Sequence, residues 1–82
     1  MRINRIKVVL VENGKKNKWL AKQMRKNEST VSNWCTNESQ PSLETLIEVA
    51  NTLKVDVREL LILTKNDKKN YLRYQQGQFI YN

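Results

Sequence analysis

The fold is decided by residues 27–34, which read Asn27-Glu28-Ser29-Thr30-Val31-Ser32-Asn33-Trp34. An Asn at the start can cap a helix, and a Glu in the first turn favours the positive end of the helix dipole. Val31 and Trp34 lie three residues apart, so they share one helix face and are expected to pack inward. The outer positions hold only hydrogen-bonding side chains, namely Glu28, Ser29, Thr30, Ser32 and Asn33. The stretch therefore predicts a short capped helix with a polar outer face that carries no cation.

A second short helix is expected just before this stretch. Asn17 can act as its N-cap, and apolar residues follow at helical spacing, namely Leu20, Ala21 and Met24. The helical pattern is then broken by Arg25-Lys26-Asn27. Two short helices joined by a tight turn, the second presented outward, form a helix-turn-helix, and the major groove of B-DNA admits one α-helix. Residues 17–36 therefore predict a reader of the major groove of double-stranded DNA.

Helical periodicity continues on both sides of this pair. A first helix is indicated by Ile3, Ile6, Val9 and Leu10 and is ended by Asn13-Gly14. Ser42 is expected to cap a long helix whose inner stripe is Leu43, Leu46, Ile47, Ala50 and Leu53. Asp56 and Glu59 have the spacing of a capping box for a last helix through Leu60 and Leu61. No segment before residue 64 alternates with a two-residue period, so we expect an all-α bundle of five helices without a sheet.

Residues 65–82 differ in composition from the expected domain, residues 1–64. They are rich in Asn, Gln and Lys, and they contain Tyr71, Tyr74, Phe79 and Tyr81. One interpretation is a disordered basic, aromatic tail, because chain termini fray unless they are tied down. The other is an extension that contacts a second subunit or a partner protein, or that packs back on the bundle.

Composition narrows the function further. The 82 residues suffice for one small domain, and the net charge is +7. Residues 1–26 hold nine Lys and Arg against Glu12, whereas residues 27–64 hold six acids against Lys54 and Arg58. A polyanion would therefore meet a positive N-terminal half.

The residue types also exclude several function classes. The sequence has no His and no Gly-rich phosphate loop, and Cys35 is its single Cys, so it predicts no enzyme, no metal site and no cofactor. A single Cys also fits a cytoplasmic, reducing location. No apolar run exceeds four residues, so no membrane span or signal peptide is expected.

Several motifs agree with one family in order and spacing. They are Leu20-Ala21, Ser29-Thr30-Val31-Ser32-Asn33-Trp34, Pro41-Ser42-Leu43-Glu44-Thr45-Leu46, Ala50, Leu53-Lys54-Val55 and Glu59-Leu60-Leu61. Over about residues 4–63 the chain resembles the lambda-repressor-like, Cro-type helix-turn-helix family, also called the XRE family. The resemblance implies a five-helix DNA-binding domain of a bacterial or phage regulator. It also implies a homodimer that binds a palindromic operator.

The resemblance also implies roles for single residues. The base-reading positions correspond to Glu28, Ser29, Thr30 and Asn33. Asn33 can pair with adenine, whereas Glu28 either accepts from cytosine or only favours the helix N-terminus. DNA-backbone contacts are expected from the basic cluster and the flanking polar residues, namely Lys16, Asn17, Lys18, Lys22, Arg25, Lys26, Ser32, Thr36, Asn37 and Ser39.

The chain departs from the family at four positions. Arg25 stands where the family usually has Gly in the turn, so a positive φ there would cost on the order of 1 kcal/mol. Lys26 replaces a commonly apolar residue, and Cys35 and Asn37 replace the frequent Glu and Gly. Trp34 is interpreted as a packing residue rather than a base stacker, Trp19 as half-buried, and Cys35 as a small buried residue rather than a redox sensor.

Two functions remain open from the sequence. The first is a DNA-binding transcriptional regulator, a repressor acting as a homodimer. The alternative is an antitoxin-type module that binds a partner protein through residues 65–82 while it regulates its own operon. For the dimer interface, the first expectation is a patch of Leu60, Leu61 and Leu63 on the last helix, and the second is the tail.

Overall fold

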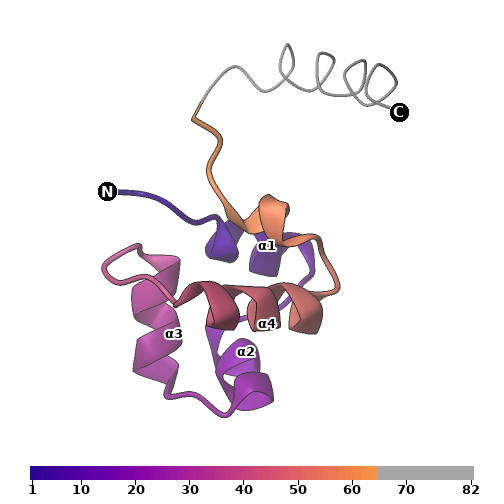
Figure 1. Ribbon diagram of the computed structural model, residues 1–82. Coiled ribbons are helices and arrows are strands. Elements are labelled where there is room, and N and C mark those ends of the chain that lie inside the picture. The colour runs from indigo at the N-terminus through magenta and orange to yellow at the C-terminus, as the bar shows by residue number, and fades with distance from the viewer. Residues whose placement is uncertain (65–82) are drawn as a thin grey trace.

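The computed structural model describes residues 1–64, and the prediction for the tail lies outside these residues. The described chain forms four α-helices and one short 3-10 helix, η1 (Figure 1). Their bounds are α1 Ile6–Glu12, α2 Asn17–Met24, α3 Glu28–Cys35, α4 Leu43–Leu53 and η1 Val57–Leu60. The all-α class is confirmed. None of these helices is long and apolar enough to cross a membrane.

At three of the four predicted helix N-termini, the predicted residue is the N-cap and its side chain makes the capping hydrogen bond. The side chain of Asn27 accepts a hydrogen bond from the Ser29 amide at 3.0 Å, and Ser42 accepts from the Thr45 amide at 3.1 Å. Asp56 accepts from the Arg58 amide at 2.8 Å. The prediction for α2 was wrong by one residue, because its N-cap is Lys16, which makes no side-chain cap bond, and Asn17 is already helical. Gly14 has a φ of +68° and turns the chain after α1, as predicted.

The fifth predicted helix is a single 3-10 turn rather than an α-helix. The backbone carbonyl of Leu60 accepts the Arg5 amide at 2.8 Å, and the Ile62 amide donates to the Ile3 carbonyl at 2.9 Å. These bonds draw residues 61–62 into an antiparallel bridge, Asn4 with Leu61, which a continuing helix could not form. The same pairing keeps Ile3 out of α1.

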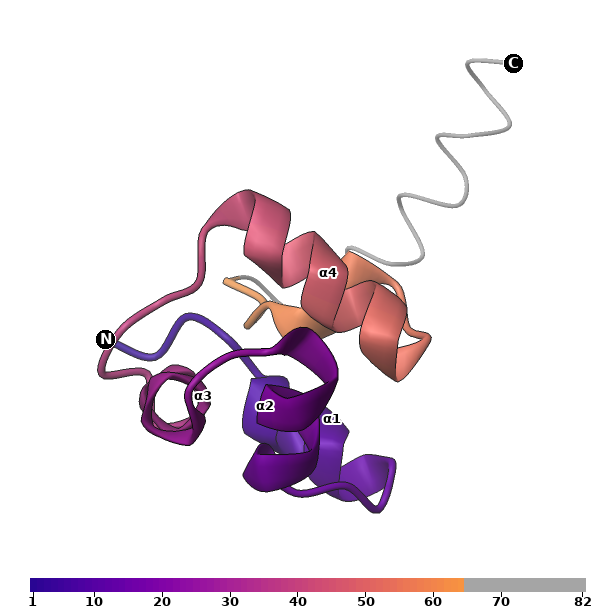
Figure 2. The ribbon, with the colours of Figure 1, turned by 90° about the horizontal axis from the view of Figure 1, so that it is seen from below.

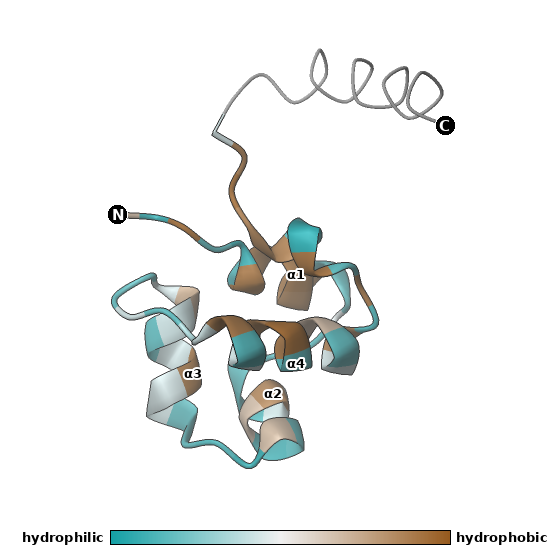
Figure 3. Cartoon of the chain, in the orientation of Figure 1, coloured by the Kyte–Doolittle hydropathy of each residue, from teal (hydrophilic) through white to brown (hydrophobic). Residues whose placement is uncertain are grey.

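The core is built from one face of each helix. Its buried members are Ile6, Val9, Leu10, Leu20, Ala21, Val31, Trp34, Cys35, Leu46, Val49, Ala50, Leu53 and Leu60. Two members of the predicted α4 stripe lie outside it, since Leu43 is 78% exposed and Ile47 is 50% exposed. Val49 takes the inner position instead, because the buried face of α4 is centred one residue later in the helix. Figure 3 shows hydrophobic residues along α4 and along the segment that leaves η1, and hydrophilic residues in the α2–α3 turn.

The predicted dimer patch is also corrected by burial. Leu60 is fully buried and cannot contact a partner, whereas Leu61 and Leu63 are exposed but lie after η1 rather than on a helix. The reason is that Leu60 fills the core between α1 and α4, while the bridge to Asn4 turns the next residues outward.

A polar cluster centred on the buried Asn4 ties the N-terminal segment to the end of α3. We call it the polar clasp, and its members are Asn4, Asn37, Gln40 and the carbonyl of Trp34. Asn4 is only 2% exposed. Its side-chain nitrogen donates to the Trp34 carbonyl at 2.9 Å and to the side-chain oxygen of Gln40 at 2.7 Å. The side-chain oxygen of Asn37 accepts the backbone amides of residues 3 and 4 at 2.7 and 2.9 Å. Because buried amides are costly unless paired, the clasp fixes where α3 ends relative to α1.

Candidate nucleic-acid interface

α3 is held at the edge of the bundle by its packing against α2. Leu20 and Ala21 of α2 meet Val31 and Trp34 of α3 in the core. Figure 2 views α3 along its axis and shows it at the outer edge, away from the centre of the bundle. One side of α3 is therefore anchored, and the opposite side is presented to solvent.

The turn between α2 and α3 bends sharply at Arg25. This residue has φ 55° and ψ 42°, the left-handed conformation that the family's usual Gly adopts easily, so the positive φ considered from the sequence is present. The turn is closed by two backbone bonds, from the Arg25 amide to Lys22 at 3.3 Å and from the Lys26 amide to Ala21 at 2.9 Å. A left-handed conformation at a residue with a Cβ costs on the order of 1 kcal/mol, which the surrounding packing has to offset.

The outer face of α3 carries the predicted base-reading residues. Glu28, Ser29 and Asn33 are exposed, and Thr30 is half-buried, as is Ser32. The Ser29 hydroxyl donates to Asn27 at 2.9 Å, which fixes its orientation at the helix start. The side-chain amide of Asn33 makes no hydrogen bond within residues 1–64, so both its donor and its acceptor are available to a ligand.

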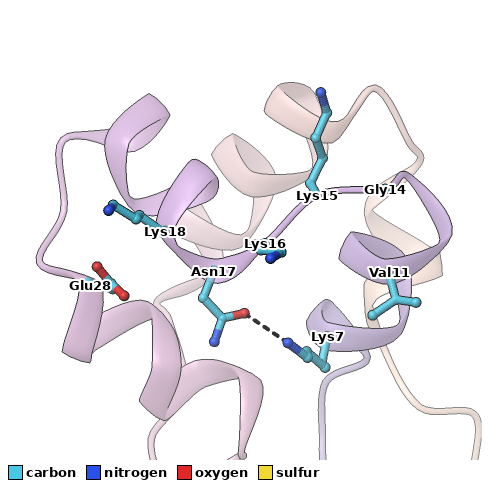
Figure 4. Close-up of a pocket in the computed structure, with 8 residues that line it drawn as sticks. All are labelled: Lys7, Val11, Gly14, Lys15, Lys16, Asn17, Lys18 and Glu28. Carbon is cyan, nitrogen blue, oxygen red and sulfur yellow. Dashed lines mark hydrogen bonds between the residues drawn. The ribbon is translucent and has the colours of Figure 1, made fainter.

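A basic groove lies next to this face, between α1 and the start of α2. It encloses about 660 Å³ and is lined by Lys7, Val11, Gly14, Lys15, Lys16, Asn17, Lys18 and Glu28. We call it the lysine groove. Glu28 is its only acidic member and lies at its edge on α3 (Figure 4). Such a concentration of ammonium groups beside a helix N-terminus favours an anion.

Asn17 is the centre of the lysine groove and is held from two sides. Its side-chain oxygen accepts from the Lys7 ammonium at 3.4 Å and from the Cys35 thiol at 3.3 Å. Burial raises the pKa of the Cys35 thiol, and the nearby Lys7 charge acts in the opposite direction, so the thiol stays protonated and can donate. Figure 4 shows the amide nitrogen of Asn17 directed away from Lys7. Because the oxygen already accepts two hydrogen bonds, the side-chain nitrogen is the part of Asn17 that can donate to a ligand.

The predicted basic residues are spread over more than one place on the surface. Lys16, Asn17 and Lys18 line the lysine groove, whereas Arg25 borders a separate hollow of about 330 Å³ between α2 and α4. Lys22 and Lys26 are exposed near the C-terminal end of α2. Lys15 is turned away from Asn17 in Figure 4, and its ammonium lies 4.7 Å from the centre of the half-buried Trp19 ring.

Lys7 was missed by the sequence analysis. It lies on α1, ten residues before Asn17, and nothing in the helical periodicity indicates that α1 reaches the start of α2. Only the packing of α1 against the rest of the bundle brings it there.

The loop after α3 contains two exposed polar residues, and a third, Asn37, whose side chain is hydrogen-bonded within the protein. Thr36 and Ser39 are exposed, and the Thr36 hydroxyl donates to the Asn33 carbonyl and to Glu38, both at 3.2 Å. Asn37 adopts a φ of 63°, and both ends of its side chain are used inside the polar clasp. The structure therefore gives the Asn37 side chain an internal hydrogen-bonding role, and its predicted contact with a phosphate stays a prediction.

The chain was compared with known proteins. The model of the helix-turn-helix family HTH_3 matches residues 6–60, more than half of the chain. A comparison with curated proteins finds no significant match. Among solved structures, the chain is similar to a crystal structure described as a "putative DNA-binding protein" from Bacteroides fragilis. The two are 56% identical with a TM-score of 0.73, and the match covers 76% of this chain and 100% of the other.

These matches agree with the geometry of α2, its turn and α3. They also confirm the family resemblance found in the sequence. The chain belongs to the XRE-type helix-turn-helix family.

Proposed function

We propose that this protein is a sequence-specific regulator of transcription that binds double-stranded DNA with α3 in the major groove. The observation that carries the proposal is the position of the cation-free polar face of α3 directly beside the lysine groove, with Glu28 belonging to both. A helix inserted in the major groove has phosphates on either side of it. The two surfaces therefore fit two parts of one duplex.

The proposal assigns different roles to the two surfaces. Asn33, Thr30 and Ser29 would contact base edges, and Lys16, Asn17, Lys18 and Lys7 would contact one stretch of backbone. Lys22, Arg25 and Lys26, with Ser32, Thr36 and Ser39, would contact phosphates farther along. Affinity then comes mainly from charge neutralisation, which releases counterions and depends strongly on salt. Specificity comes from hydroxyl and amide contacts.

The finer parts of the proposal concern assembly and outcome. We propose a homodimer that represses by occupying a palindromic operator, with half-sites about one helical turn, roughly 34 Å, apart. The support is the family membership together with a single small domain, which reads too few bases alone for a unique site. The single Cys supports a reducing, cytoplasmic location, and the proposed activity needs no catalysis.

Selection of bound duplexes from a random pool, followed by fluorescence anisotropy at several salt concentrations, tests the proposal. We expect a palindromic consensus that is bound at least about a thousandfold more tightly than scrambled duplex at the same salt. Recovery of no consensus, with equal affinity for all duplexes, would exclude a sequence-specific regulator and leave a nonspecific DNA binder.

The composition of residues 65–82 supports a second candidate. Four aromatic residues and four Lys or Arg in 18 residues suit an extension that binds a protein, as in an antitoxin. Affinity purification of the full-length chain from its native host tests this function. A stoichiometric partner that is lost when Tyr71, Tyr74, Phe79 and Tyr81 are replaced by Ser supports it, and recovery of the chain alone contradicts it.

A further inference from the structure

The first turns of α4 expose an apolar pair bordered by acids. Leu43 and Ile47 lie one helical turn apart and are 78% and 50% exposed. Glu44 and Glu48 follow them directly on the helix and are also exposed. Neither carboxylate forms an ion pair within residues 1–64. The ion pair found among these residues joins Arg58 and Asp56. We call these four residues the α4 ridge.

A groove of opposite charge lies where the N-terminal segment meets the segment after η1. It encloses about 410 Å³ and is lined by Arg2, Asn4, Arg5, Val8, Ile62 and Leu63. We call it the arginine groove. Its apolar members are exposed to solvent, with Val8 at 40%, Ile62 at 36% and Leu63 at 62%. Within residues 1–64 no carboxylate lines it, and the hydrogen bond of the Arg5 guanidinium found there goes to the neutral carbonyl of Glu59, at 3.1 Å.

The α4 ridge and the arginine groove complement each other in both polarity and charge. Each has an apolar centre of two or three exposed side chains, and contact between the two surfaces would remove these side chains from water. One has two unpaired carboxylates beside that centre, and the other has two guanidinium groups without a carboxylate partner within the described chain. Arg and carboxylate groups form the strongest charge-assisted hydrogen bonds available to side chains. The two surfaces would therefore cover each other better than either is covered by water.

We propose that the α4 ridge of one copy docks into the arginine groove of a second copy. Because both surfaces belong to the same chain, two copies related by a two-fold axis would make this contact twice. This pairing supplies the dimer of the function proposed above and in that sense rests on it. The tail is a poorer occupant of the arginine groove, because residues 65–82 hold four Lys or Arg against Asp67 and share the sign of its charge.

Charge reversal in the full-length protein without DNA tests the interface. Sedimentation equilibrium would compare the wild type with Glu44→Lys/Glu48→Lys and with Arg2→Glu/Arg5→Glu. The matched control, Glu12→Lys/Glu38→Lys, changes two exposed acids outside both surfaces. We expect each interface variant to weaken self-association by at least about tenfold, because like charges then face each other, and the control to leave it unchanged. Far-UV circular dichroism would establish that all variants are folded.

Rescue of the pairing gives the sharper readout. An equimolar mixture of the two interface variants, and a single chain with all four reversals, should associate again, since opposite charges then face each other. A wild type that stays monomeric at several hundred micromolar would overturn the interface, as would interface variants that behave like the control or a mixture that stays monomeric.

Different results would refute the proposed interface and the proposed DNA function. On a duplex with one half-site, Glu44→Lys/Glu48→Lys should bind at least as well as the wild type, because α3 and the lysine groove are untouched and the net charge is more positive. A wild type that dimerises but binds no duplex would refute the DNA function and leave the interface standing. Loss of the interface alone would leave one domain bound to one half-site.

Discussion

The outer face of α3 and the lysine groove are neighbours that differ in how they are built. The α3 face comes from consecutive residues of one helix and contains no cation. The lysine groove is assembled from α1, the following turn, α2 and Glu28 of α3, and it contains four Lys. Under the proposed function, recognition and affinity are therefore separable, so a change in one region should leave the measured property of the other intact.

The largest expected effect is on stability, and it comes from removing the Trp34 side chain that packs α3 against the core. Trp34 lies on the inner face of α3 and is only 5% exposed, so Trp34→Ala should lower the free energy of unfolding by about 3–5 kcal/mol. Urea denaturation followed by circular dichroism measures this. Trp19→Ala is the matched control, because Trp19 is only half-buried and its replacement should cost clearly less. Equal losses of stability for both variants would contradict the packing role of Trp34.

The next effect tests the α3 face alone. Asn33→Ala should weaken binding to the selected operator by about 1–3 kcal/mol and relax specificity at one base pair, with the salt dependence unchanged. Anisotropy titrations with operator and scrambled duplexes measure both quantities. Asn51→Ala, an exposed amide on α4, provides the control. If Asn33→Ala binds both duplexes as the wild type does, Asn33 reads no base.

The lysine groove should respond in the opposite way. Lys16→Gln/Lys18→Gln should weaken operator and scrambled duplex equally, since phosphates carry no sequence information. The slope of log K against log salt should become shallower by about 0.9 for each phosphate that the variant no longer neutralises. Lys54→Gln removes an exposed charge at the end of α4 and should leave the slope unchanged. A selective loss of affinity for the operator would show that the groove reads sequence.

A smaller effect separates backbone strain from charge. Arg25 and Lys54 both end a helix in the left-handed conformation, with φ of 55° and 59°. Glycine at either position should raise the free energy of unfolding by up to about 1 kcal/mol, because the Cβ is removed. Only Arg25→Gly should also make the salt dependence of DNA binding shallower. An identical effect of both variants on DNA binding would remove Arg25 from the phosphate contacts.

The smallest effect concerns the thiol where the two regions meet. Burial raises the pKa of Cys35 above its ordinary value of 9.0, so the unfolded chain loses this proton at lower pH than the folded one. The stability linked to the protonated thiol is therefore fully present below pH 9.0 and declines as the pH rises through the folded pKa. Denaturation at pH 8 to 10 should show a steeper decline for the wild type than for Cys35→Ser. Parallel declines would contradict the shift.

The parts of the molecule that local sequence determines were predicted well. The caps at Asn27, Ser42 and Asp56 each depend on residues within three positions. The α3 face was found for the same reason, since one helix places its own side chains. The predicted roles of its residues toward DNA stay predictions.

The parts that depend on distant contacts were not predicted. Lys7 enters the lysine groove, and Asn4 meets Asn37, through packing between segments far apart in the chain. The α4 stripe was misjudged at Leu43 and Ile47 because periodicity alone does not tell which apolar residues the neighbouring helices reach. The last helix was shortened by pairing with residues 3–5, which no pattern in residues 56–63 indicates.

The polar clasp gives the domain a mechanical property. A pull on the chain at Thr64 first loads the bond from the Ile62 amide to the Ile3 carbonyl. The load then passes through the amides of residues 3 and 4 to Asn37, and from Asn4 to the carbonyl of Trp34 in α3. Every link between segments on this path is a hydrogen bond, and antiparallel pairs that are pulled from one end open one bond at a time. Tension applied at Thr64 would therefore act on the end of α3 through these bonds as well as on the apolar core through the buried Leu60.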